Sequence, residues 1–413
     1  MAADKKTRLS VDKLKLGIYV DLELTWAQHP FLFRQFVIKS ANDIQVIKEL
    51  GLTEVTVIPD RCRTDIPDSD TDRQVAPENN EKLWEKKRRR IDEAANYRYQ
   101  RQKRSKEYLE RVKQIKNLTS NLKHAPANAI KTAREVAGLM TETFVSDSDV
   151  LINLVNFTDD RFTMHHHTLN VTVLTLSLAK ALGIKDLDLH WLCVGAILHD
   201  IGKAAVPSKI LLKTSSLNIS EQKLLNSHPF FGGSLARKLE GVSDKVAEII
   251  EQHHEYIDGS GFPKSLKGDA ISPLARIVAI TNTYDNLCNP SDAKNALTPK
   301  AAMAILYFKH KDQLDSKIVQ NFIRCMGVYP PGTIVILSDG SVGLVTGVSS
   351  KALLQPQILL YHQDIPRTEA LNIDLTHHPE LTIKDVMIAS ECPKRIYEYL
   401  GITERTGYYY EQI

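Results

Sequence analysis

The sequence predicts a mainly α protein, in which an all-α helical bundle follows a small α+β domain and precedes a short β-rich extension. Three observations lead to this prediction. Apolar residues recur at helical spacing almost throughout residues 129–328. Short runs of alternating apolar residues flank that stretch on both sides. The chain has 413 residues, too many for one average core, so we expect several domains.

Residues 1–60 form the predicted α+β domain. A turn at Gly17 precedes a strand-like segment, and residues 54–59 predict another strand. Between these segments, Ser40 is a typical helix cap for a helix over residues 44–50.

Residues 61–128 are predicted to be a linker followed by a long basic helix. The first part, 61–80, is polar and rich in Pro and Asp. Residues 81–118 contain no Pro or Gly and include the basic run KKRRR at 86–90. Because acidic residues are interspersed and no recognition motif accompanies the run, we expect no nucleic-acid binding. A solvated helix that spaces domains or forms a homodimer through residues 81–118 is the preferred interpretation.

The bundle over residues 129–328 is punctuated by Gly and Pro residues, which separate its predicted helices. The predicted helical segments cover 130–145, 149–157, 168–182, 187–198, 220–240, 243–254, 273–287, 299–308 and 315–326. Residues 329–413 are the predicted extension, with a β-hairpin over 333–348 and a third strand over 357–361.

The composition argues against a membrane or secreted protein. Net charge is +3, and no apolar run is long enough to span a bilayer. The first ten residues lack the apolar core of a signal peptide. The five cysteines are scattered and never in CxxC spacing, which argues against a disulfide framework or a zinc ribbon. We therefore expect a cytoplasmic protein without a membrane partner.

Histidine and acidic residues fall at the ends of several predicted helices. Bundle cores commonly build metal sites from side chains of separate helices. Imidazole nitrogens and carboxylate oxygens together suit Fe, Mn, Zn, Co and Ni, whereas an all-oxygen set suits Mg or Ca. A lone histidine is usually structural, but the ordered conjunction favours a transition-metal site. The candidate ligands are His167, His199, Asp200, His228, His253, His254 and Asp285.

Asp200 is the predicted bridging ligand, because a carboxylate can offer one oxygen to each of two metals. Two metals about 3.5–4 Å apart can clamp the attacking and leaving oxygens of a displacement at phosphorus. Lys203, one turn past His199, can place a cation on a phosphate oxygen. The simpler alternative for this segment is a helix C-cap with Gly202 in the left-handed conformation.

Three motifs surround the candidates in the order His-Asp-Ile-Gly-Lys (199–203), His-Pro (228–229) and His-His-Glu leading to Gly-Phe-Pro (253–263). Together they resemble the signature of HD-GYP domains, a branch of the HD phosphohydrolase superfamily, over about residues 150–328. The front block resembles a small domain often found before HD-GYP domains in bacteria. The resemblance implies an HD-type bundle that hydrolyses cyclic di-GMP to pGpG and GMP, or 3'3'-cyclic GMP-AMP.

Residue by residue, the resemblance implies roles for each motif. It implies metal ligands at the six candidates from His167 to His254, and a phosphate-contacting lysine at Lys203. It implies two divalent transition metals, with Fe or Mn first and Ni, Co or Zn as alternatives. It also links the loop Gly261, Phe262 and Pro263 to partner contacts, for which signalling proteins of the GGDEF or PilZ type are candidates.

Four departures from the family pattern bear on these roles. Phe262 replaces the tyrosine of Gly-Tyr-Pro, a change that we expect to touch no metal ligand. Asn282 stands where the family's usual last ligand is an aspartate, and Asp285 lies one turn later, so either residue could complete the site. Thr163 stands where members with three metals carry glutamate, which predicts two metals. An Arg-Pro-Tyr-Arg run is missing, and Lys294 could supply part of its positive charge to the substrate.

Two hypotheses follow, from different classes. The first is an active cyclic-dinucleotide phosphodiesterase. The second is a catalytically degenerate module that binds metal or nucleotide and signals through protein partners, which Asn282 favours. A different HD hydrolase, acting on a mononucleotide or ppGpp, fits the Gly-Phe-Pro motif less well.

Overall fold

The computed structural model describes residues 6–24, 28–31, 34–63, 80–122, 124–145, 150–155, 162–213, 215–349, 351–363, 365–403 and 405–412. Most of the predicted linker, residues 64–79, lies outside the described residues. The chain divides into two compact units. One comprises residues 1–99 with 362–372, and the other comprises residues 100–361 with 373–413. No described helix is long and apolar enough to cross a membrane.

The first unit contains a four-stranded antiparallel sheet and, between its strands β3 and β4, the helix α1 (Ala41–Glu49). Ser40 caps α1, since its hydroxyl accepts from the Asp43 amide while the Asp43 carboxylate accepts from the Ser40 amide. The predicted α+β character of this region is confirmed. The strands, in the sheet order β1-β4-β2-β3, are β1 (Thr7–Ser10), β4 (Glu54–Val57), β2 (Tyr19–Asp21) and β3 (Gln35–Val37).

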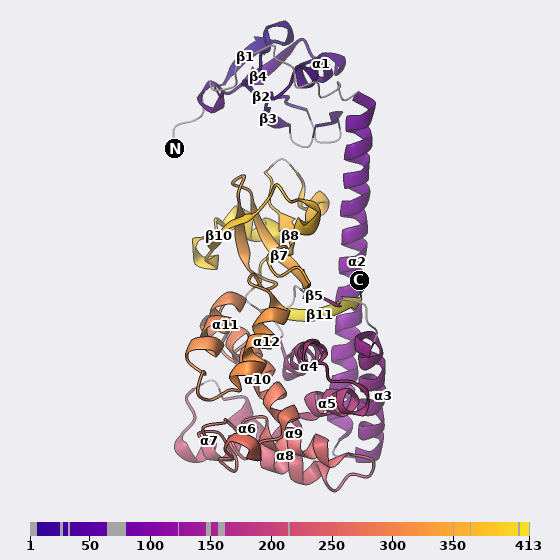
Figure 1. Ribbon diagram of the computed structural model, residues 1–413, viewed down its shortest axis with the longest axis vertical. Helices are drawn as coiled ribbons and strands as arrows, with labels where there is room; N and C mark the ends of the chain where they lie inside the picture. Colours follow the sequence, from indigo (N-terminus) through magenta and orange to yellow (C-terminus); the bar gives the residue numbers. More distant parts are fainter. Residues whose placement is uncertain are drawn as a thin grey trace. The chain divides into compact units, whose positions relative to one another are not determined.

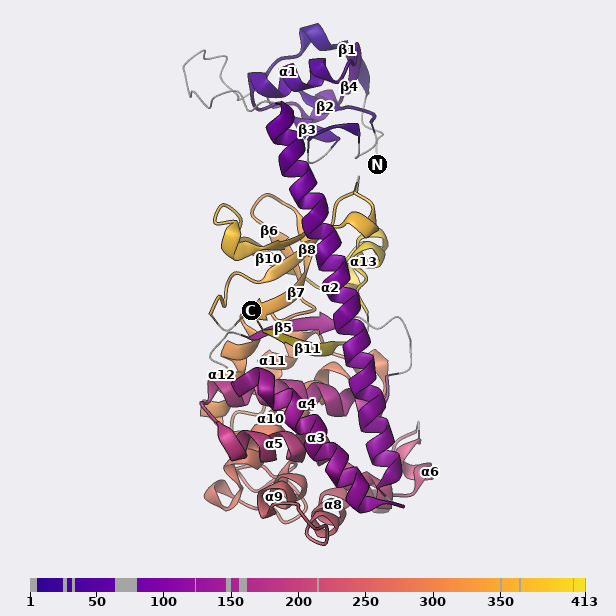
Figure 2. The same ribbon diagram turned by 90° about the vertical axis from the view of Figure 1, so that its right-hand side faces the viewer.

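The predicted long helix is α2 (Asn80–Asn121), which passes from the first unit into the second. Within the second unit, Tyr108, Ile115 and Leu118 of α2 are buried in the main core. The chain then turns back into α3 (Pro126–Val145), which packs on this part of α2 (Figure 2). The second half of α2 is therefore a core element rather than a free spacer.

The helical part of the second unit contains the candidate ligands, and its interior is apolar, as Leu174, Val194, Ile249 and Ile280 show. Most predicted helices are present; the predicted segment 220–240 is two helices, broken before His228. After α3 they are α4 (Met164–Ala181), α5 (Asp186–Leu198), α6 (Ser208–Leu211), α7 (Ile219–Leu225), α8 (His228–Ala236), α9 (Asp244–Gln252), α10 (Pro273–Cys288), α11 (Pro299–Phe308) and α12 (Ser316–Met326), labelled in Figure 1.

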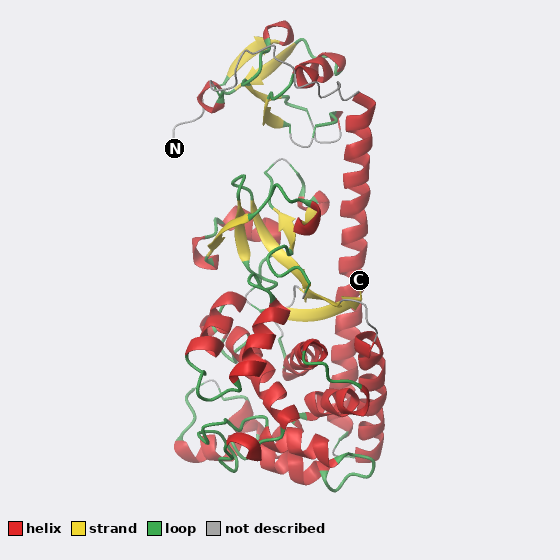
Figure 3. Ribbon diagram, viewed as in Figure 1, coloured by secondary structure: helices red, strands yellow, loops and turns green. Residues whose placement is uncertain are grey.

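A sheet adjoins these helices within the same unit, as Figure 3 shows by colour. Its strands run in the order β10-β6-β7-β5-β11, with β8 beside β7 and β9 beside β8. The short helix α13 (Lys394–Leu400) precedes the last strand. The strands are β5 (Val150–Val155), β6 (Ile334–Leu337), β7 (Val342–Ser349), β8 (Gln357–Leu360), β9 (Asn372–Asp374), β10 (Ile383–Met387) and β11 (Gly407–Gln412).

The prediction of a helix over residues 149–157 is wrong, because residues 150–155 form strand β5. A short apolar run cannot be assigned to a strand or a buried helix from its periodicity alone. Here the decision comes from β11, which pairs with β5 antiparallel along its whole length, and from β7 on the other side. Residues 407–412 thus belong to the same sheet as a strand that precedes α4.

Candidate metal centre

The candidate ligands come from the ends of four helices. His167 lies in the first turn of α4, and His199 is the C-cap of α5, followed by Asp200. His228 is the first residue of α8. His253 is the C-cap of α9, so that the adjacent pair His253–His254 follows that helix. At these positions a side chain can project past the helix end toward a neighbouring helix.

The structure brings six of the predicted residues into two groups. In each group, one ligand atom per residue lies within 4.8 Å of the others. All six are buried except His254, which is partly exposed. The groups are His167, His199 and Asp200, and His228, His253 and His254.

Asp200 lies between the two groups, and its two oxygens face different histidines. Oδ2 is 3.4 Å from Nε2 of His199 and 3.9 Å from Nε2 of His167. Oδ1 is 3.2 Å from Nε2 of His228 and 3.9 Å from Nε2 of His253. A carboxylate so placed can offer one oxygen to each of two cations.

Three of the imidazoles are oriented by a backbone carbonyl close to them in the sequence. Nδ1 of His199, His228 and His253 lies 2.8 Å from the carbonyl oxygen three residues earlier in each case. This hydrogen bond requires the proton on Nδ1, and it leaves the lone pair of Nε2 available to a metal.

His167 is oriented by a side chain instead. Its Nδ1 donates to Oδ2 of Asp285 at 2.6 Å. The other oxygen of Asp285 accepts from the side-chain amides of Asn170 and Asn289, at 2.8 and 2.9 Å. A carboxylate behind a ligating histidine fixes its tautomer and raises its basicity. Asp285, which belongs to neither group among the described residues, thus stands behind a ligand rather than beside it.

Asn282 lies one turn before Asp285 on α10 and is buried. Its side-chain oxygen accepts a hydrogen bond from Asn286 at 2.9 Å. The carboxylate of Asp285 accepts hydrogen bonds from three side chains. The side chain of Asn282 therefore has fewer of its hydrogen-bonding positions occupied than that of Asp285.

Three of the six residues, those of the first group, carry unsatisfied atoms that fit a metal site. Nε2 of His167, Nε2 of His199 and Oδ1 of Asp200 are buried and have no hydrogen-bond partner among the described residues. Buried polar atoms without partners are rare and costly. Nitrogen and oxygen lone pairs that converge without donors are a suitable environment for a transition metal.

The electrostatics of the cluster also favour metal binding. Burial, and then the neighbouring histidines, lower the pKa of His253 and His254 well below the usual 6.5. Burial would raise the pKa of Asp200, but Lys203 and His199 outweigh it and hold the pKa of that carboxyl well below its usual value. His253 and His254 are therefore neutral imidazoles and Asp200 is an ionised carboxylate near neutral pH, the forms that bind metals.

Lys203 lies beside the carboxylate of Asp200, in the 3-10 helix Ile201–Ala205. Its ammonium is 2.6 Å from Oδ2 of Asp200, and its side chain is 27% exposed. A partly exposed cation at the edge of the cluster can contact an anionic substrate without occupying a ligand position.

Gly202 does not act as a left-handed helix cap, so that alternative is wrong. It lies inside the same 3-10 helix, packed against the start of α8. A Cβ at this position would lie 1.8 Å from the carbonyl oxygen of His228 and 2.5 Å from the amide nitrogen of Gly232. Glycine is needed here because the segment that carries Asp200 touches the helix that carries His228.

The expectation that Phe262 touches no candidate ligand is also wrong. Its ring stacks on the imidazole of His254, with centroids 4.5 Å apart and planes at 21°. It also meets His228 edge to face at 6.4 Å. Glu255 holds the loop that carries Phe262, since its carboxylate accepts from the amides of Lys264 and Leu266. The Gly-Phe-Pro loop is therefore part of the wall of the cluster.

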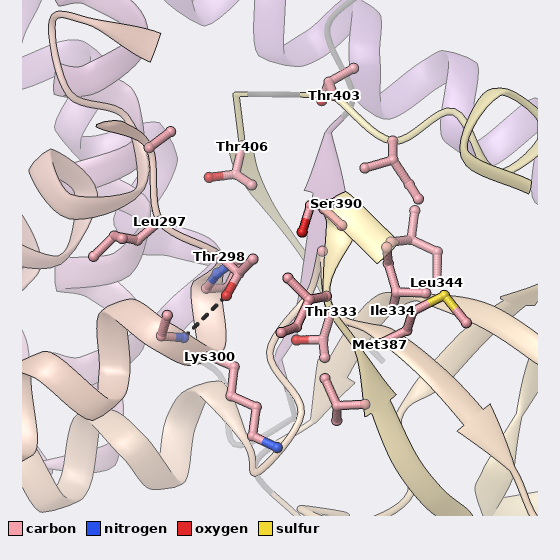
Figure 4. Close-up of a pocket in the computed structure, with 18 of the residues that line it drawn as sticks. Leu297, Thr298, Lys300, Thr333, Ile334, Leu344, Met387, Ser390, Thr403 and Thr406 are labelled. Carbon is pink, nitrogen blue, oxygen red and sulfur yellow. Dashed lines mark hydrogen bonds between the residues drawn. The ribbon is translucent and has the colours of Figure 1, made fainter. Parts of the chain in front are cut away.

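Two other positions singled out in the sequence, Thr163 and Lys294, do not belong to the cluster. Thr163 caps α4, and its hydroxyl lies 2.8 Å from Nδ1 of His166. Lys294 lines a cavity of about 800 Å³ between the start of α11 and the sheet, shown in Figure 4. None of the six grouped residues lines that cavity. The structure therefore does not bring Lys294 to the cluster.

Sequence reasoning missed Asn170 and Asn289. Asn170 follows His167 by three residues on α4, and Asn289, the C-cap of α10, follows Asp285 by four, so each lies about one turn from a member of the His167–Asp285 pair. That spacing was the available signal. What it could not show is that both amides meet at one oxygen of Asp285.

Comparison with known proteins agrees with this geometry. Residues 149–318 match the HD domain family, and residues 6–133 match a domain of unknown function, DUF3391. The cyclic di-GMP phosphodiesterase PA4108 of Pseudomonas aeruginosa is 27% identical over 86% of this chain and 84% of its own length. The response regulator RpfG of Xanthomonas campestris, a cyclic di-GMP phosphodiesterase, is 35% identical over 35% of this chain and 39% of its own length.

A third relative is the 3'3'-cGAMP-specific phosphodiesterase 3 of Vibrio cholerae, 34% identical over 40% of this chain and 35% of its own length. The matches to the Xanthomonas and Vibrio proteins are thus confined to less than half of each protein. These matches assign residues 149–318 to the HD domain family and make the chain similar to cyclic-dinucleotide phosphodiesterases, in agreement with the helical bundle and the two groups already described.

Proposed function

We propose that this protein is a metal-dependent phosphodiesterase that hydrolyses a cyclic dinucleotide, either cyclic di-GMP to pGpG and GMP or 3'3'-cyclic GMP-AMP. The observation that carries the proposal is the position of Asp200, whose two oxygens face separate histidine groups. Relatives that bear the names of cyclic di-GMP and 3'3'-cGAMP phosphodiesterases support the substrate class. They do not favour a module that only binds.

We propose two divalent transition metals as cofactors, Fe or Mn first and Ni, Co or Zn as alternatives. One would be held by the group of His167 and His199, the other by the group of His228, His253 and His254, with Asp200 shared. The presence of Thr163 as a helix cap supports two metals rather than three, since its side chain is engaged by His166. We further propose Asn282 as the ligand from α10, with Asp285 as the residue that orients His167.

When bound, such a metal pair supplies Lewis acidity that activates water and neutralises charge at phosphorus. The protein's own residues do the rest. Asp200 fixes the spacing of the two halves of the site. Lys203 can turn from Asp200 toward a non-bridging phosphate oxygen, where negative charge increases during displacement. Phe262 covers one face of His254 and limits water access from that side.

The test is turnover of both cyclic dinucleotides by protein purified anaerobically, with the metal content of the same sample measured. We expect turnover that requires metal. His199→Ala and Asp200→Ala should each lower kcat/KM by at least about 1,000-fold, equivalent to about 4 kcal/mol. Full activity in either variant would refute the mechanism, and nucleotide binding without turnover would support the signalling module instead.

We propose the Gly-Phe-Pro loop as the contact for signalling partners of the GGDEF or PilZ type. Phe262 and Pro263 line a surface cavity of about 580 Å³ together with Leu217 and Ile219, and the side chain of Ile219 is 88% exposed.

We also propose a homodimer through residues 81–118, in which the exposed side chains of Tyr99 and Leu109 on α2 would contact the second copy. Light scattering of the Leu109→Glu variant against the unaltered protein tests that dimer.

A further inference from the structure

A chain of hydrogen bonds connects the metal cluster to the C-terminal strand. His167 Nδ1 donates to Asp285, whose second oxygen accepts from both Asn170 and Asn289. Each asparagine uses its remaining amide proton on the carbonyl oxygen of Thr406, at 2.9 Å in both cases. Thr406 immediately precedes β11.

The two asparagines also accept hydrogen bonds from this segment. The side-chain oxygen of Asn289 accepts from the backbone amide of Thr406 at 2.9 Å. The side-chain oxygen of Asn170 accepts from the amide of Tyr408 at 3.1 Å and from the hydroxyl of Tyr108 at 2.9 Å. All four hydrogen-bonding positions of Asn170 are thus filled, so its rotamer is fixed by partners on three different elements.

We propose that residues 406–408 position the metal centre, acting through Asn170 and Asn289 on Asp285 and so on His167. The inference rests on the proposed function only in taking His167 as a metal ligand. Residues 406–408 lie outside the matched HD domain, which ends at residue 318. The metal site is therefore incomplete without the strand that the chain adds at its end.

The physical reason is the burial of Asp285. It is completely buried, and a buried carboxylate without enough donors is costly. Two amides satisfy Oδ1, and both amides are themselves held by one backbone carbonyl. If that carbonyl were absent, the amides would be free to rotate away, and Asp285 would hold the His167 ring less firmly. Partners behind a ligating histidine commonly affect metal affinity about 10- to 100-fold.

The test measures metal binding rather than turnover. Co²⁺ and Mn²⁺ affinities are measured by competition with a chromophoric chelator, and the visible spectrum of the Co²⁺ protein reports ligand geometry. We expect Asn170→Ala and Asn289→Ala each to weaken metal binding by about 10-fold and to change the Co²⁺ spectrum. Both amides act on one oxygen of Asp285. The loss of metal affinity in the double variant should therefore be smaller than the product of the fold-losses in the two single variants. Thr406→Pro removes the amide that Asn289 accepts from and should act in the same direction.

Asn153→Ala is the matched control. Asn153 is also a buried asparagine, and it lies on β5 within 3.5 Å of Glu411 of β11, but it makes no bond to the Asp285 chain. The Asn153→Ala substitution should lower the melting temperature of the metal-free protein without changing its metal affinity. The inference is overturned if the Asn170 and Asn289 variants bind both metals as the unaltered protein does, or if Asn153→Ala weakens binding equally. If the unaltered protein itself binds no metal, the proposed function fails instead.

Discussion

The two groups differ in how one histidine is held. In the second group, His228 and His253 bond to backbone carbonyls three residues earlier, so the residues just before each histidine orient it. In the first group, His199 is held in the same way by the carbonyl of Ala196, but His167 depends on Asp285, a residue on another helix. Because a backbone carbonyl cannot be removed by substitution, the orientation of the second group is protected from single changes, whereas that of the first group is not. The second group is oriented by local contacts, and the first group depends at His167 on the tertiary fold.

The largest effect that separates the two halves is expected from Asp285→Asn. The variant keeps the shape but loses the charge behind His167, so metal affinity of the first group should fall about 10- to 100-fold while the second group keeps its metal. A metal titration should then show two separated binding steps. The control Asp315→Asn weakens the cap of α12, where Asp315 accepts from Lys317 and Ile318, and should lower only the melting temperature. Equal loss at both steps would show that the halves are not independent.

A gain is expected from Asn282→Asp, which places a carboxylate on α10 where this chain has an amide. An anionic ligand binds a divalent metal more tightly than a neutral one. We therefore expect about 10-fold tighter metal binding, about 1.4 kcal/mol, and a shift in the metal that supports turnover. Asn295→Asp adds the same charge at an exposed position in the 3-10 helix Ala293–Asn295 and serves as control. No gain, or an equal gain from the control, would argue against Asn282 as a ligand.

A smaller effect is expected in the second group from Phe262→Ala. The stacked ring supports His254, and aromatic pairs of this kind contribute about 0.5–1.5 kcal/mol. Metal affinity should fall about 2- to 10-fold, measured by the same titration. Phe262→Tyr keeps the ring and should bind metal as the unaltered protein does. An Ala variant with unchanged affinity would reduce Phe262 to a loop residue without influence on the cluster.

The smallest effect concerns the stability of the metal-free protein at different pH. The pKa of His253 and of His254 is lowered in the folded state, so below about pH 6.5 the unfolded chain binds protons that the folded chain does not. Stability should therefore fall as the pH drops from about 7 to about 5, by at most about 1.4 kcal/mol per pH unit for each histidine. Melting curves of chelator-treated protein test this, and His254→Asn should flatten the dependence. A steeper dependence in that variant would contradict the assignment.

The sequence predicted the helices and strands of this protein better than the tertiary contacts between them. Helical spacing, caps such as Ser40, and the breaks at Gly and Pro located most helices, because those signals are local. The motif from His199 to Lys203 and the pair His253–His254 also identified the candidate ligands without any structure. Local spacing could not assign residues 150–155, since a short, mostly apolar segment becomes a strand only by pairing with other strands, here β11 and β7.

The sequence by itself indicated the HD domain, the reaction class that we propose and the six residues that converge. Only the tertiary structure decided what each does there. In the folded chain, Asp200 lies between the histidines of both groups, and Asp285 bonds to His167. Phe262 stacks on His254, and Thr406 accepts hydrogen bonds from Asn170 and Asn289. The physical reason is that a residue's type fixes which bonds it can make. Which partner it meets depends on contacts between segments far apart in the chain, and no local pattern encodes them.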